Sequence, residues 1–315
     1  MTTVFHQGEL VIQTESGVEE RTHKFGNKLI RDHIIGQHKE FYEKLSYVFV
    51  ALHDQSGQPW VSLIQGEPGF INSPDNKTLN LSGSVIGAEE LGLQSNQGNY
   101  IGIVGLDFSN RRRNRLNGSL KAASNAHFLS IDVEHSFGNC PKYIQQRNHQ
   151  PITINDADQP RNKLIIEKLD IFSDDDINTM TQADTLFIAS SEKPDGNLDV
   201  NHRGGKPGFV RVEDDNQLWF NDYPGNNFFQ TFGNIHNHPN VGLLFLDFKS
   251  GDLLLISGQA RLEKSDLADN NKKNKTKFLP RRFYFNLDRG LRIKEGVYGR
   301  WTQEEISPFL EDLID

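Results

Sequence analysis

Cysteine is nearly absent from this 315-residue chain, and long apolar runs and export signals are missing. The single cysteine, Cys140, excludes an intrachain disulfide and, by itself, a cysteine-rich metal site. No segment approaches the roughly 18 apolar residues that a membrane-spanning helix needs. The first residues, MTTVFHQGEL, contain no basic stretch followed by an apolar run, so they do not resemble a signal peptide. We therefore expect a reducing, cytoplasmic compartment.

Positive charge is also in short supply. The chain has 34 Lys and Arg against 42 Asp and Glu, which gives a net charge of −8 and a pI near 5.8. Nucleic acid and anionic membranes are therefore not expected as partners. The composition, 36% hydrophobic and 24% charged, is typical of a soluble globular protein, and the length suits about two domains.

Signs of metal or nucleophile chemistry are lacking as well. His236 and His238, in the run HNHP, would point to the same side of a strand, but no acidic or cysteine partner lies at ligand spacing. We therefore predict no metal site. No Ser-His-Asp arrangement is evident, and the sequence places neither a histidine nor a carboxylate beside Cys140. The catalytic residues, if there are any, stay unknown.

The chain begins with a helical region and then becomes β-rich. Residues 1–45 predict a leader followed by helices over 18–29 and 33–45, where apolar residues recur at three- and four-residue spacings. After them, the short β-type runs YVFVALHD, PWVSLIQ and KTLNLSG are separated by turn signals. Residues 174–176 form an acidic helix start, and RRFYFNLD is the last β-type run. The polar, lysine-rich stretch 262–277 predicts a solvated loop.

The chain also repeats itself. GEPGF at 66–70 recurs as GKPGF at 205–209, a shift of 205 − 66 = 139, and IGIVGLDF at 101–108 corresponds to VGLLFLDF at 241–248 at a shift of 140. Within and after that block, Gly102 and Gly118 match Gly242 and Gly258. So steady a shift predicts a duplicated β domain, built as a barrel or a sandwich because the strands are many and short. The boundary between the copies is expected between about residues 151 and 162.

One stretch, residues 199–235, combines features that suit a phosphorylated ligand. Arg203 is a charged fork that matches phosphate, and Gly204 with Gly205 would let a ligand approach the backbone closely. Pro224 and Gly225 precede an apolar helix whose free N–H groups would suit an anion. The alternative is an ordinary turn with a solvated arginine.

The two copies differ at the places where a ligand would bind. The first copy has RRRNRLNG at 111–118, whereas the second has GDLLLISG. On a strand, Arg111, Arg113 and Arg115 would share one face and repel one another unless an anion or carboxylates intervene. The alternative is an exposed edge strand protected by its charge. We interpret the divergence as one ligand site to which each copy contributes different groups.

Taken together, these motifs resemble the pyridoxamine 5′-phosphate oxidase-like, FMN-binding split-barrel superfamily, and more closely its tandem flavin-nucleotide-binding members. The matching segments, spread over most of residues 5–261, are FHQGEL, GEPGF, DFSNRRRNRLNG, FGNCPKYIQQR, HRGGKPGF, DYPGNNFFQTFGNI and VGLLFLDFKSGDLLLISG. The resemblance implies a mainly β fold with a few helices, in which two tandem split β-barrels form an internal pseudo-dimer. The N-terminal leader and helices would occupy residues 1–45, the first barrel 46–155 and the second barrel 162–315.

The resemblance also implies where a cofactor binds. In that superfamily FMN lies in the cleft between two barrels, with its phosphate held by basic residues and a helix start. The residues implied for the site are Arg203, Gly204 and Gly205 on the flavin-contacting strand; Tyr223, Gly225, Asn226 and Asn227 on the turn that enters the phosphate-side helix; and Arg111, Arg113, Arg115, Asn139, Lys142, Tyr143 and Gln145 from the first barrel.

The sequence departs from the family pattern at one point. Many relatives have arginine or lysine just after the Gly-Asn step, whereas this chain continues with Asn227, Phe228 and Phe229. The phosphate charge would then be met by Arg203, the arginine strand or Lys142. The substrate-binding residues of the oxidase itself are not evident, so pyridoxamine phosphate is not predicted as the substrate.

The function implied by the resemblance is an FMN-dependent oxidoreductase whose substrate is unknown. Its partners would be a small-molecule substrate or a reduced nicotinamide donor, and a homodimer is a further candidate. One alternative is a non-catalytic module, a carrier or sensor, that binds a flavin, a deazaflavin or haem. Another is a duplicated barrel that only mediates association.

Overall fold

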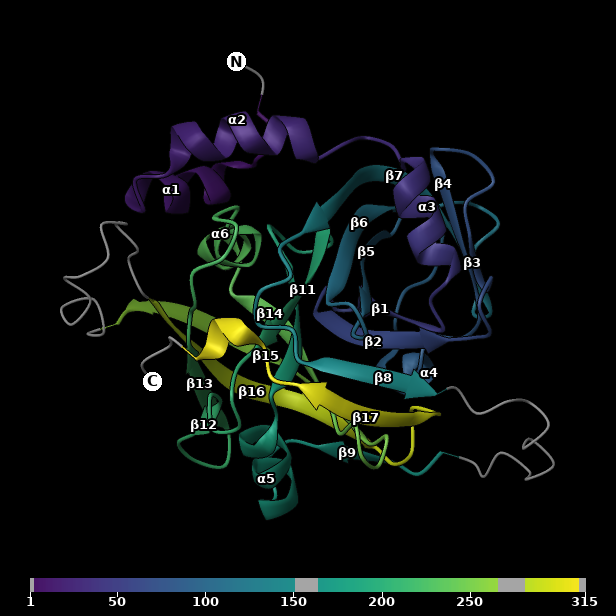
Figure 1. The fold of residues 1–315 in the computed structure, drawn as a ribbon. Helices are drawn as coiled ribbons and strands as arrows, with labels where there is room; N and C mark the ends of the chain where they lie inside the picture. Colours follow the sequence, from purple (N-terminus) through teal and green to yellow (C-terminus); the bar gives the residue numbers. More distant parts are fainter. Residues whose placement is uncertain (1–2, 151–163, 266–280, 312–315) are drawn as a thin grey trace.

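The computed structural model describes residues 3–150, 164–265 and 281–311, and its core is two curled antiparallel sheets (Figure 1). The first sheet has the strand order β2-β1-β5-β6-β7-β4-β3, and the second has the order β11-β10-β14-β15-β16-β13-β12, with β9 added beside β16. The two orders are the same when β1 to β7 of the first sheet are matched in turn with β10 to β16 of the second. The expected mainly β fold of two tandem split barrels is confirmed.

The first sheet follows the β-type runs of the sequence. Its strands are β1 (Tyr47–His53), β2 (Pro59–Gln65), β3 (Ile71–Asn72), β4 (Thr78–Ser82), β5 (Tyr100–Asp107), β6 (Arg112–Leu120) and β7 (Phe128–Asn139), with the short helix α4 (Ala88–Leu91) between β4 and β5. Every residue of β1 is buried, because one face packs in its own barrel and the other against the second barrel.

The second sheet is built in the same way. Its strands are β9 (Ile166–Leu169), β10 (Thr185–Ser191), β11 (Leu198–Gly204), β12 (Arg211–Val212), β13 (Gln217–Asn221), β14 (Asn240–Leu246), β15 (Leu253–Lys264) and β16 (Arg281–Ile293). Helix α5 (Asp174–Gln182) begins at the predicted acidic start, where Ser173 and Asp176 form a capping box. Helix α6 (Gln230–Asn237) follows β13. A small third sheet pairs β8 (Gln146–Gln150) with β17 (Arg300–Glu305), and the turn η3 (Pro308–Leu310) follows it.

Two of the repeated glycines mark the same β-bulge in each barrel. The register shifts between Asn117 and Gly118 in the first sheet and between Ser257 and Gly258 in the second. A Cβ on Gly118 would lie 2.1 Å from a backbone oxygen, and one on Gly258 would lie 1.9 Å from another. Only glycine fits at either bulge, which accounts for its recurrence at a shift of 140.

The other repeated pair of glycines brings the barrels together. A Cβ on Gly102 would lie 2.7 Å from the backbone oxygen of Leu198 in β11, and one on Gly242 would lie 2.5 Å from that of Pro59 in β2. Between these two contacts Phe49 and its counterpart Phe187 stack with ring centroids 3.6 Å apart. Matched residues thus meet across one interface, as expected for an internal pseudo-dimer.

Three helices precede the first sheet: α1 (Gln7–Glu15), α2 (Glu19–Leu29) and α3 (Gly36–Glu43). Helices α2 and α3 were predicted, but the expected leader contains α1, which lies beside α6 (Figure 1). Its buried face is Gly8, Glu9, Ile12 and Gln13, and so polar a face gives no apolar periodicity to detect.

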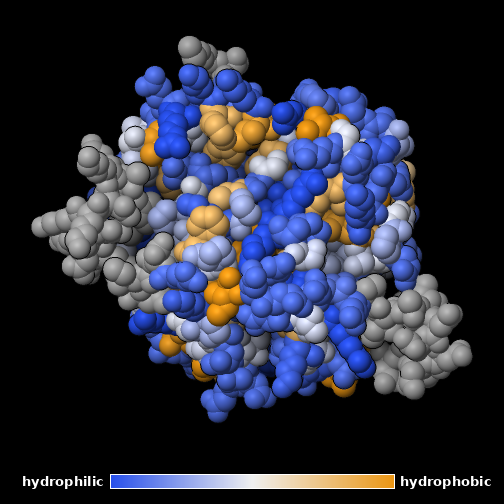
Figure 2. Space-filling model, viewed as in Figure 1, coloured by the Kyte–Doolittle hydropathy of each residue, from blue (hydrophilic) through white to orange (hydrophobic). Residues whose placement is uncertain are grey.

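The surface in the same view is largely hydrophilic, with smaller hydrophobic areas (Figure 2). Within the described ranges, no helix is long and apolar enough to cross a membrane. The predicted boundary between residues 151 and 162 lies outside the described residues, and so does most of the predicted loop at 262–277, whose first residues extend β15.

Candidate functional site

A pocket opens where β11 of the second barrel meets β6 and the loop that follows β7 in the first. The connection between β13 and α6 completes its wall. Its empty volume, counted out to the solvent, is about 600 Å³. The lining residues are Arg113, Asn139, Cys140, Lys142, Tyr143, Asn201, His202, Arg203, Gly204, Phe209, Phe220, Asn221, Asp222, Tyr223, Gly225 and Asn226.

The structure brings together most of the residues implied for the cofactor site. Those that line the pocket are Arg203, Gly204, Tyr223, Gly225, Asn226, Arg113, Lys142 and Tyr143. Asn139 lines it as well. Gly205, Asn227, Arg111, Arg115 and Gln145 do not line it. Their roles in ligand binding stay predictions.

Arg113 is the arginine of β6 that faces the pocket. Its Nη1 donates to Nδ1 of His202 at 3.1 Å. Because a guanidinium only donates, the Nδ1 atom accepts and Nε2 carries the ring hydrogen. Burial, and then the charges of Arg113 and Arg203, hold the pKa of His202 well below its usual range, so the ring is neutral. His202 therefore presents a hydrogen-bond donor.

Several buried donors around the pocket lack an acceptor. Within the described part of the chain, no partner is found for Nε of Arg113, Nε of Arg203, Nδ2 of Asn201 or Nε2 of His202. Leaving a buried donor unsatisfied costs about 1–3 kcal/mol, so such groups are rarely gathered without a reason. A ligand rich in acceptor oxygens, such as a phosphate, would satisfy them.

One carboxyl group shares the pocket with these cations. Burial raises the pKa of Asp222 to about 6, although the charges of Arg203 and Arg281 act in the opposite direction. An anionic ligand bound beside it would disfavour the carboxylate further. The charge of the pocket therefore depends on pH near neutrality.

The loop after β7 is fixed against the second barrel by Tyr143. This residue adopts a positive φ of 65°, and its hydroxyl donates to the backbone oxygen of Pro224 at 2.9 Å. Its ring lies 5.3 Å from that of Tyr223. A Cβ on Gly204 would lie 2.0 Å from the backbone oxygen of Tyr143, so this glycine is required for the approach of the loop. Gly204 was expected to let a ligand approach the backbone closely, and in the structure the backbone of Tyr143 makes such an approach.

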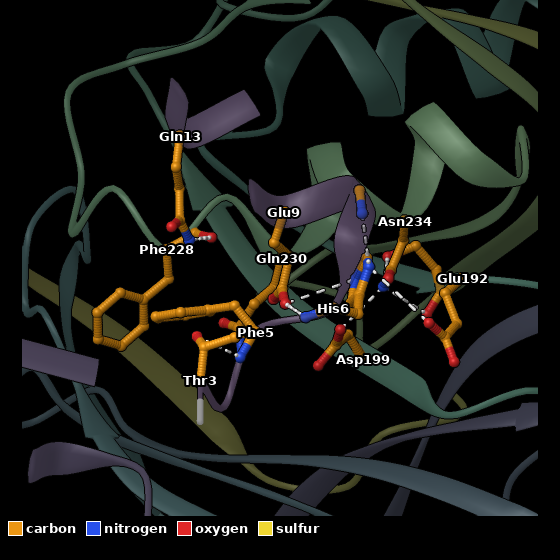
Figure 3. Close-up of polar contacts among 12 residues, drawn as sticks. Thr3, Phe5, His6, Glu9, Gln13, Glu192, Asp199, Phe228, Gln230 and Asn234 are labelled. Carbon is orange, nitrogen blue, oxygen red and sulfur yellow. Dashed lines mark hydrogen bonds and ion pairs between the residues drawn. The ribbon is translucent and has the colours of Figure 1, made fainter. Parts of the chain in front are cut away.

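Arg115 lies deeper than Arg113 and has a carboxylate partner. It forms a buried ion pair with Asp199 and donates to Asn201 Oδ1 at 2.8 Å and to Gln230. Figure 3 shows Asp199 and Gln230 gathered with His6, Glu9, Glu192 and Asn234 where α1 meets α6 and β11. Burial, followed by the charge of Asp199, raises the pKa of Glu9 well above its usual range. Arg115 therefore belongs to a polar core that supports the pocket from behind.

The arginine strand differs from its prediction at one end. β6 begins at Arg112, and Arg111 has a positive φ of 59°, so Arg111 does not share the face of Arg113 and Arg115. Its Nε donates to the backbone oxygen of Ile144 at 3.1 Å, and its Nη2 lies 3.2 Å from Glu305 in β17. Arg112 lies on the opposite face, over the ring of Phe41.

The helix start is also displaced from its prediction. Helix α6 begins at Gln230 after Phe229, which has a positive φ of 58°, and neither residue lines the pocket. Asn227, with a φ of 62°, belongs to the same irregular stretch. The turn at Tyr223–Asn226, rather than the helix N terminus, faces the pocket.

The histidines of HNHP fall at the end of α6, with His236 inside the helix and His238 as its C-cap. In the described segments, no group of three or more His, Cys, Asp or Glu side chains is placed to hold a metal ion.

A family comparison matches part of the second barrel. Residues 174–276 match the family model described as pyridoxamine 5′-phosphate oxidase. The resemblance to the oxidase-like split barrels is confirmed. The matched residues include Arg203, Asp222 and the turn at Tyr223–Asn226, so they contain the second-barrel half of the pocket. No match to a curated protein was found.

Solved structures with some likeness were also found. One is a candidate pyridoxamine 5′-phosphate oxidase from Lactobacillus delbrueckii, 16% identical, covering 39% of this chain and 94% of that one, with a TM-score of 0.29. A pyridoxamine 5′-phosphate oxidase-related, FMN-binding protein from Nostoc punctiforme is 14% identical, covering 41% and 90%, with a TM-score of 0.25. A FAD-binding protein from Mesorhizobium loti is 13% identical, covering 41% and 98%, with a TM-score of 0.26. Scores this low support no argument about this chain.

Sequence reasoning missed the acidic partners of the site. Asp199 and Asn201 alternate on β11, and this alternation of polar residues on a buried strand is the signal that could have indicated them. Asp222 follows β13 directly and carried no such signal. His202 was adjacent to a predicted residue, but its contact with Arg113 depends on how the two barrels face each other.

Proposed function

We propose that the pocket binds FMN and that the protein is an FMN-dependent oxidoreductase. The observation that carries the proposal is the meeting of three cationic side chains from two barrels in one pocket: Arg113 and Lys142 from the first barrel, Arg203 from the second. They face a single carboxyl, Asp222. This arrangement suits a phosphate monoester, and the match of the second barrel to the oxidase family supports a flavin.

The residues present fit the phosphate end of such a cofactor. The guanidinium groups of Arg113 and Arg203 each have a buried Nε without an acceptor in the described segments, and a phosphate offers several. Gly225 and Asn226 are exposed, and a Cβ on Gly225 would meet no atom closer than 4.0 Å. The turn that contains them is exposed to solvent, and Asn226 Nδ2 donates to Asn139 Oδ1 of the first barrel at 2.9 Å.

FMN would supply the redox chemistry, and the chain's own residues would bind and orient it. Arg113, Lys142 and Arg203 would hold the phosphate, and the Nε2 hydrogen of His202 is placed to donate to an acceptor atom. A substrate or a reduced nicotinamide would enter from the side of the Gly225 turn.

The proposal is tested with the purified protein. Absorption bands near about 370 and 450 nm, or their appearance with added FMN, are expected from bound flavin. Cys140 gives a second readout, because it is the single cysteine of the chain and lines the pocket. Bound FMN should slow its reaction with a thiol reagent.

Each outcome separates one function from another. No flavin bands, together with unchanged labelling of Cys140 at saturating FMN, would contradict the proposal. Flavin binding without consumption of reduced nicotinamides by any small acceptor would instead support a carrier or sensor. Haem or a deazaflavin in place of FMN would keep the binding function but change the cofactor.

A further inference from the structure

The C-terminal segment of the described chain passes close to the pocket. Strand β17 pairs with β8, which directly follows the pocket loop, and the turn η3 comes next. In Figure 1 this turn is the yellow coil between the end of β17 and the C terminus, and it lies near the beginning of β8. Nothing in the sequence connected these last residues with the ligand site.

A buried glutamine fixes the turn to both barrels. Gln145 Oε1 accepts from the backbone N–H of Ser307 at 2.8 Å, and its Nε2 donates to the backbone oxygen of Gly205 at 2.9 Å. Ser307 is fully buried, and so is Leu310. One amide thus joins the C-terminal turn, the pocket loop of the first barrel and the Arg-Gly-Gly strand of the second.

Phe309 is the residue of this turn that the packing does not explain. Its side chain is 44% exposed and Pro308 beside it is also exposed, whereas Ser307 and Leu310 of the same turn are buried. Its ring lies 6.5 Å from that of Tyr143 in a T-shaped arrangement, and the ammonium of Lys142 lies 5.3 Å from its centroid. This is the distance of a cation–π contact.

Lys142 would otherwise be poorly fixed. Over the residues that the structure describes, its ammonium forms no hydrogen bond or ion pair, and its one ring contact is with Phe309. A lysine side chain has four rotatable bonds and loses considerable entropy when a ligand orders it. An aromatic face that already holds the ammonium at the pocket lowers that cost on binding.

We propose that Phe309 is a positioning residue that holds Lys142 at the rim of the pocket for an anionic ligand. The inference rests on the proposed function, because it concerns the same pocket. Phe309 acts through Lys142 and the Tyr143 loop rather than on the ligand. The C-terminal turn is then part of the ligand site and not only a cover for β8.

A double-mutant cycle tests this role with FMN as the probe. Phe309→Leu removes the aromatic face and keeps apolar bulk, and it should weaken FMN binding about two- to fivefold, as expected for a partly exposed cation–π contact. Lys142→Gln should weaken it about tenfold or more. In a chain that already carries Lys142→Gln, Phe309→Leu should not weaken FMN binding further. Phe309→Trp, made in the wild-type chain, keeps an aromatic face and should retain wild-type affinity.

Ile306→Ala is the matched control, since Ile306 is an exposed apolar residue of the same segment, 57% accessible. It should leave FMN affinity unchanged. Equal losses from Phe309→Leu with and without Lys142 would overturn the positioning role, because a purely structural effect does not depend on the ammonium.

The experiment also distinguishes failure of the inference from failure of the proposed function. If the wild type binds no FMN, the proposed function falls, and the labelling rate of Cys140 then tests the positioning role alone. Phe309→Leu should accelerate labelling severalfold in the original background because it releases Lys142, and should not do so in the Lys142→Gln background, whereas Ile306→Ala should leave labelling unchanged. Unchanged labelling in both variants would overturn the inference.

Discussion

Arg113 and Arg115 lie two residues apart on one face of β6, yet their surroundings give them different roles. Arg115 is almost fully buried and paired with Asp199. Removing it would leave a buried carboxylate unpaired, which typically costs 3–5 kcal/mol of stability. Arg113 faces the pocket and donates to the neutral ring and the backbone oxygen of His202. A loss of ligand binding in an Arg115 variant would therefore not identify a ligand contact, whereas one in an Arg113 variant would.

Arg203 gives the direct test of the phosphate site. Arg203→Ala should weaken FMN binding by about 1.5–3 kcal/mol, the contribution of a hydrogen bond to a charged group. Arg112→Ala is the control, because Arg112 lies on the outer face of β6, over Phe41, and donates to the backbone oxygen of Gln37. FMN titration followed by flavin fluorescence measures both. Equal affinities in the two variants would remove Arg203 from the site.

Asp222 makes ligand binding depend on pH. Its pKa is raised to about 6, so the carboxyl becomes charged as the pH rises through 6 and then repels a phosphate. The phosphate itself gains charge near pH 6, so the informative comparison is with Asp222→Asn. The variant should bind FMN more tightly than the wild type at pH 8 and about equally at pH 5. Parallel affinity profiles from pH 5 to 8 would contradict this.

The raised pKa of Asp222 also makes the stability of the fold depend on pH. When the pKa of a carboxyl is higher in the folded than in the unfolded chain, the fold is more stable at low pH than at high pH. The full contribution is present below the pKa of the unfolded chain, which is near 3.9. That contribution is lost as the pH rises through about 6. In the absence of ligand, Asp222→Asn should therefore raise the melting temperature at pH 8 more than at pH 4.

At the scale of elements, helices α1 and α6 cross at two glycines. A Cβ on Gly8 would lie 2.2 Å from the backbone oxygen of Gly233, and one on Gly233 would lie 2.5 Å from the backbone nitrogen of Glu9. Gln13 of α1 donates to the backbone oxygen of Phe228 at 3.1 Å, and the rings of Phe5 and Phe228 are 5.4 Å apart (Figure 3). Helix α1 thus fixes the segment that leads from the pocket turn into α6.

Separating these helices should destabilise the protein and loosen the pocket turn. Gly233→Val should lower the free energy of unfolding by about 1–3 kcal/mol, because the side chain has no room at the crossing. Gly36→Ala is the control, since a Cβ there meets no atom within 4 Å. Urea denaturation followed by circular dichroism compares the two. A Gly233 variant as stable as the Gly36 variant would contradict the close crossing.

Much of the element order could be predicted from local patterns, and the exceptions have physical causes. The runs that form β1, β2 and β4 alternate or are continuously apolar, and α5 has an acidic start. Helix α1 escaped because glycine and polar residues form its buried face. The start of α6 was misplaced because Phe228 and Phe229 extend its apolar run, although Phe229 has a positive φ.

The candidate site could also be predicted only in part from local sequence patterns. Motifs indicated the cations and glycines that line the pocket. The same motifs also indicated Arg111, Arg115 and Gly205, which do not line it. The interactions of Arg115 with Asp199 and of Lys142 with Phe309 join residues far apart in the chain. Such partners depend on the packing of one barrel against the other, which a single sequence does not specify.

At the scale of the whole molecule, the two sheets have the same strand order, so each position at the pocket has an equivalent position elsewhere between the barrels. The repeat pairs Arg203 with Ile64 on β2, and Arg113 and Arg115 with Leu253 and Leu255 on β15. The strand pairs β2–β15 and β11–β6 are then equivalent. All three apolar counterparts are buried, and two of them belong to the core between the barrels.

The counterpart of the pocket turn fills the equivalent place. At the shift of 139, Tyr223–Asn226 corresponds to residues 84–87. A Cβ on Gly87 would lie 3.1 Å from the side chain of Ile293 and 3.5 Å from that of Leu291. Ile86, which precedes α4, and Leu91 of α4 pack on the same cluster. Hydrophobic packing has replaced both the cations and the space for a ligand.

The protein should therefore bind one FMN per chain. A phosphate placed beside Leu253 and Leu255 would lose its hydration without gaining a charged partner, which is prohibitive for a dianion. When protein at a concentration well above the dissociation constant is titrated with FMN, the binding curve should break at one equivalent of FMN per chain. This ratio is the same whether or not the chain forms a homodimer. Arg203→Ala should weaken that single phase and leave no residual tight site. A break at two equivalents would show that the barrels retain equal sites and would contradict the asymmetry on which the pocket assignment depends.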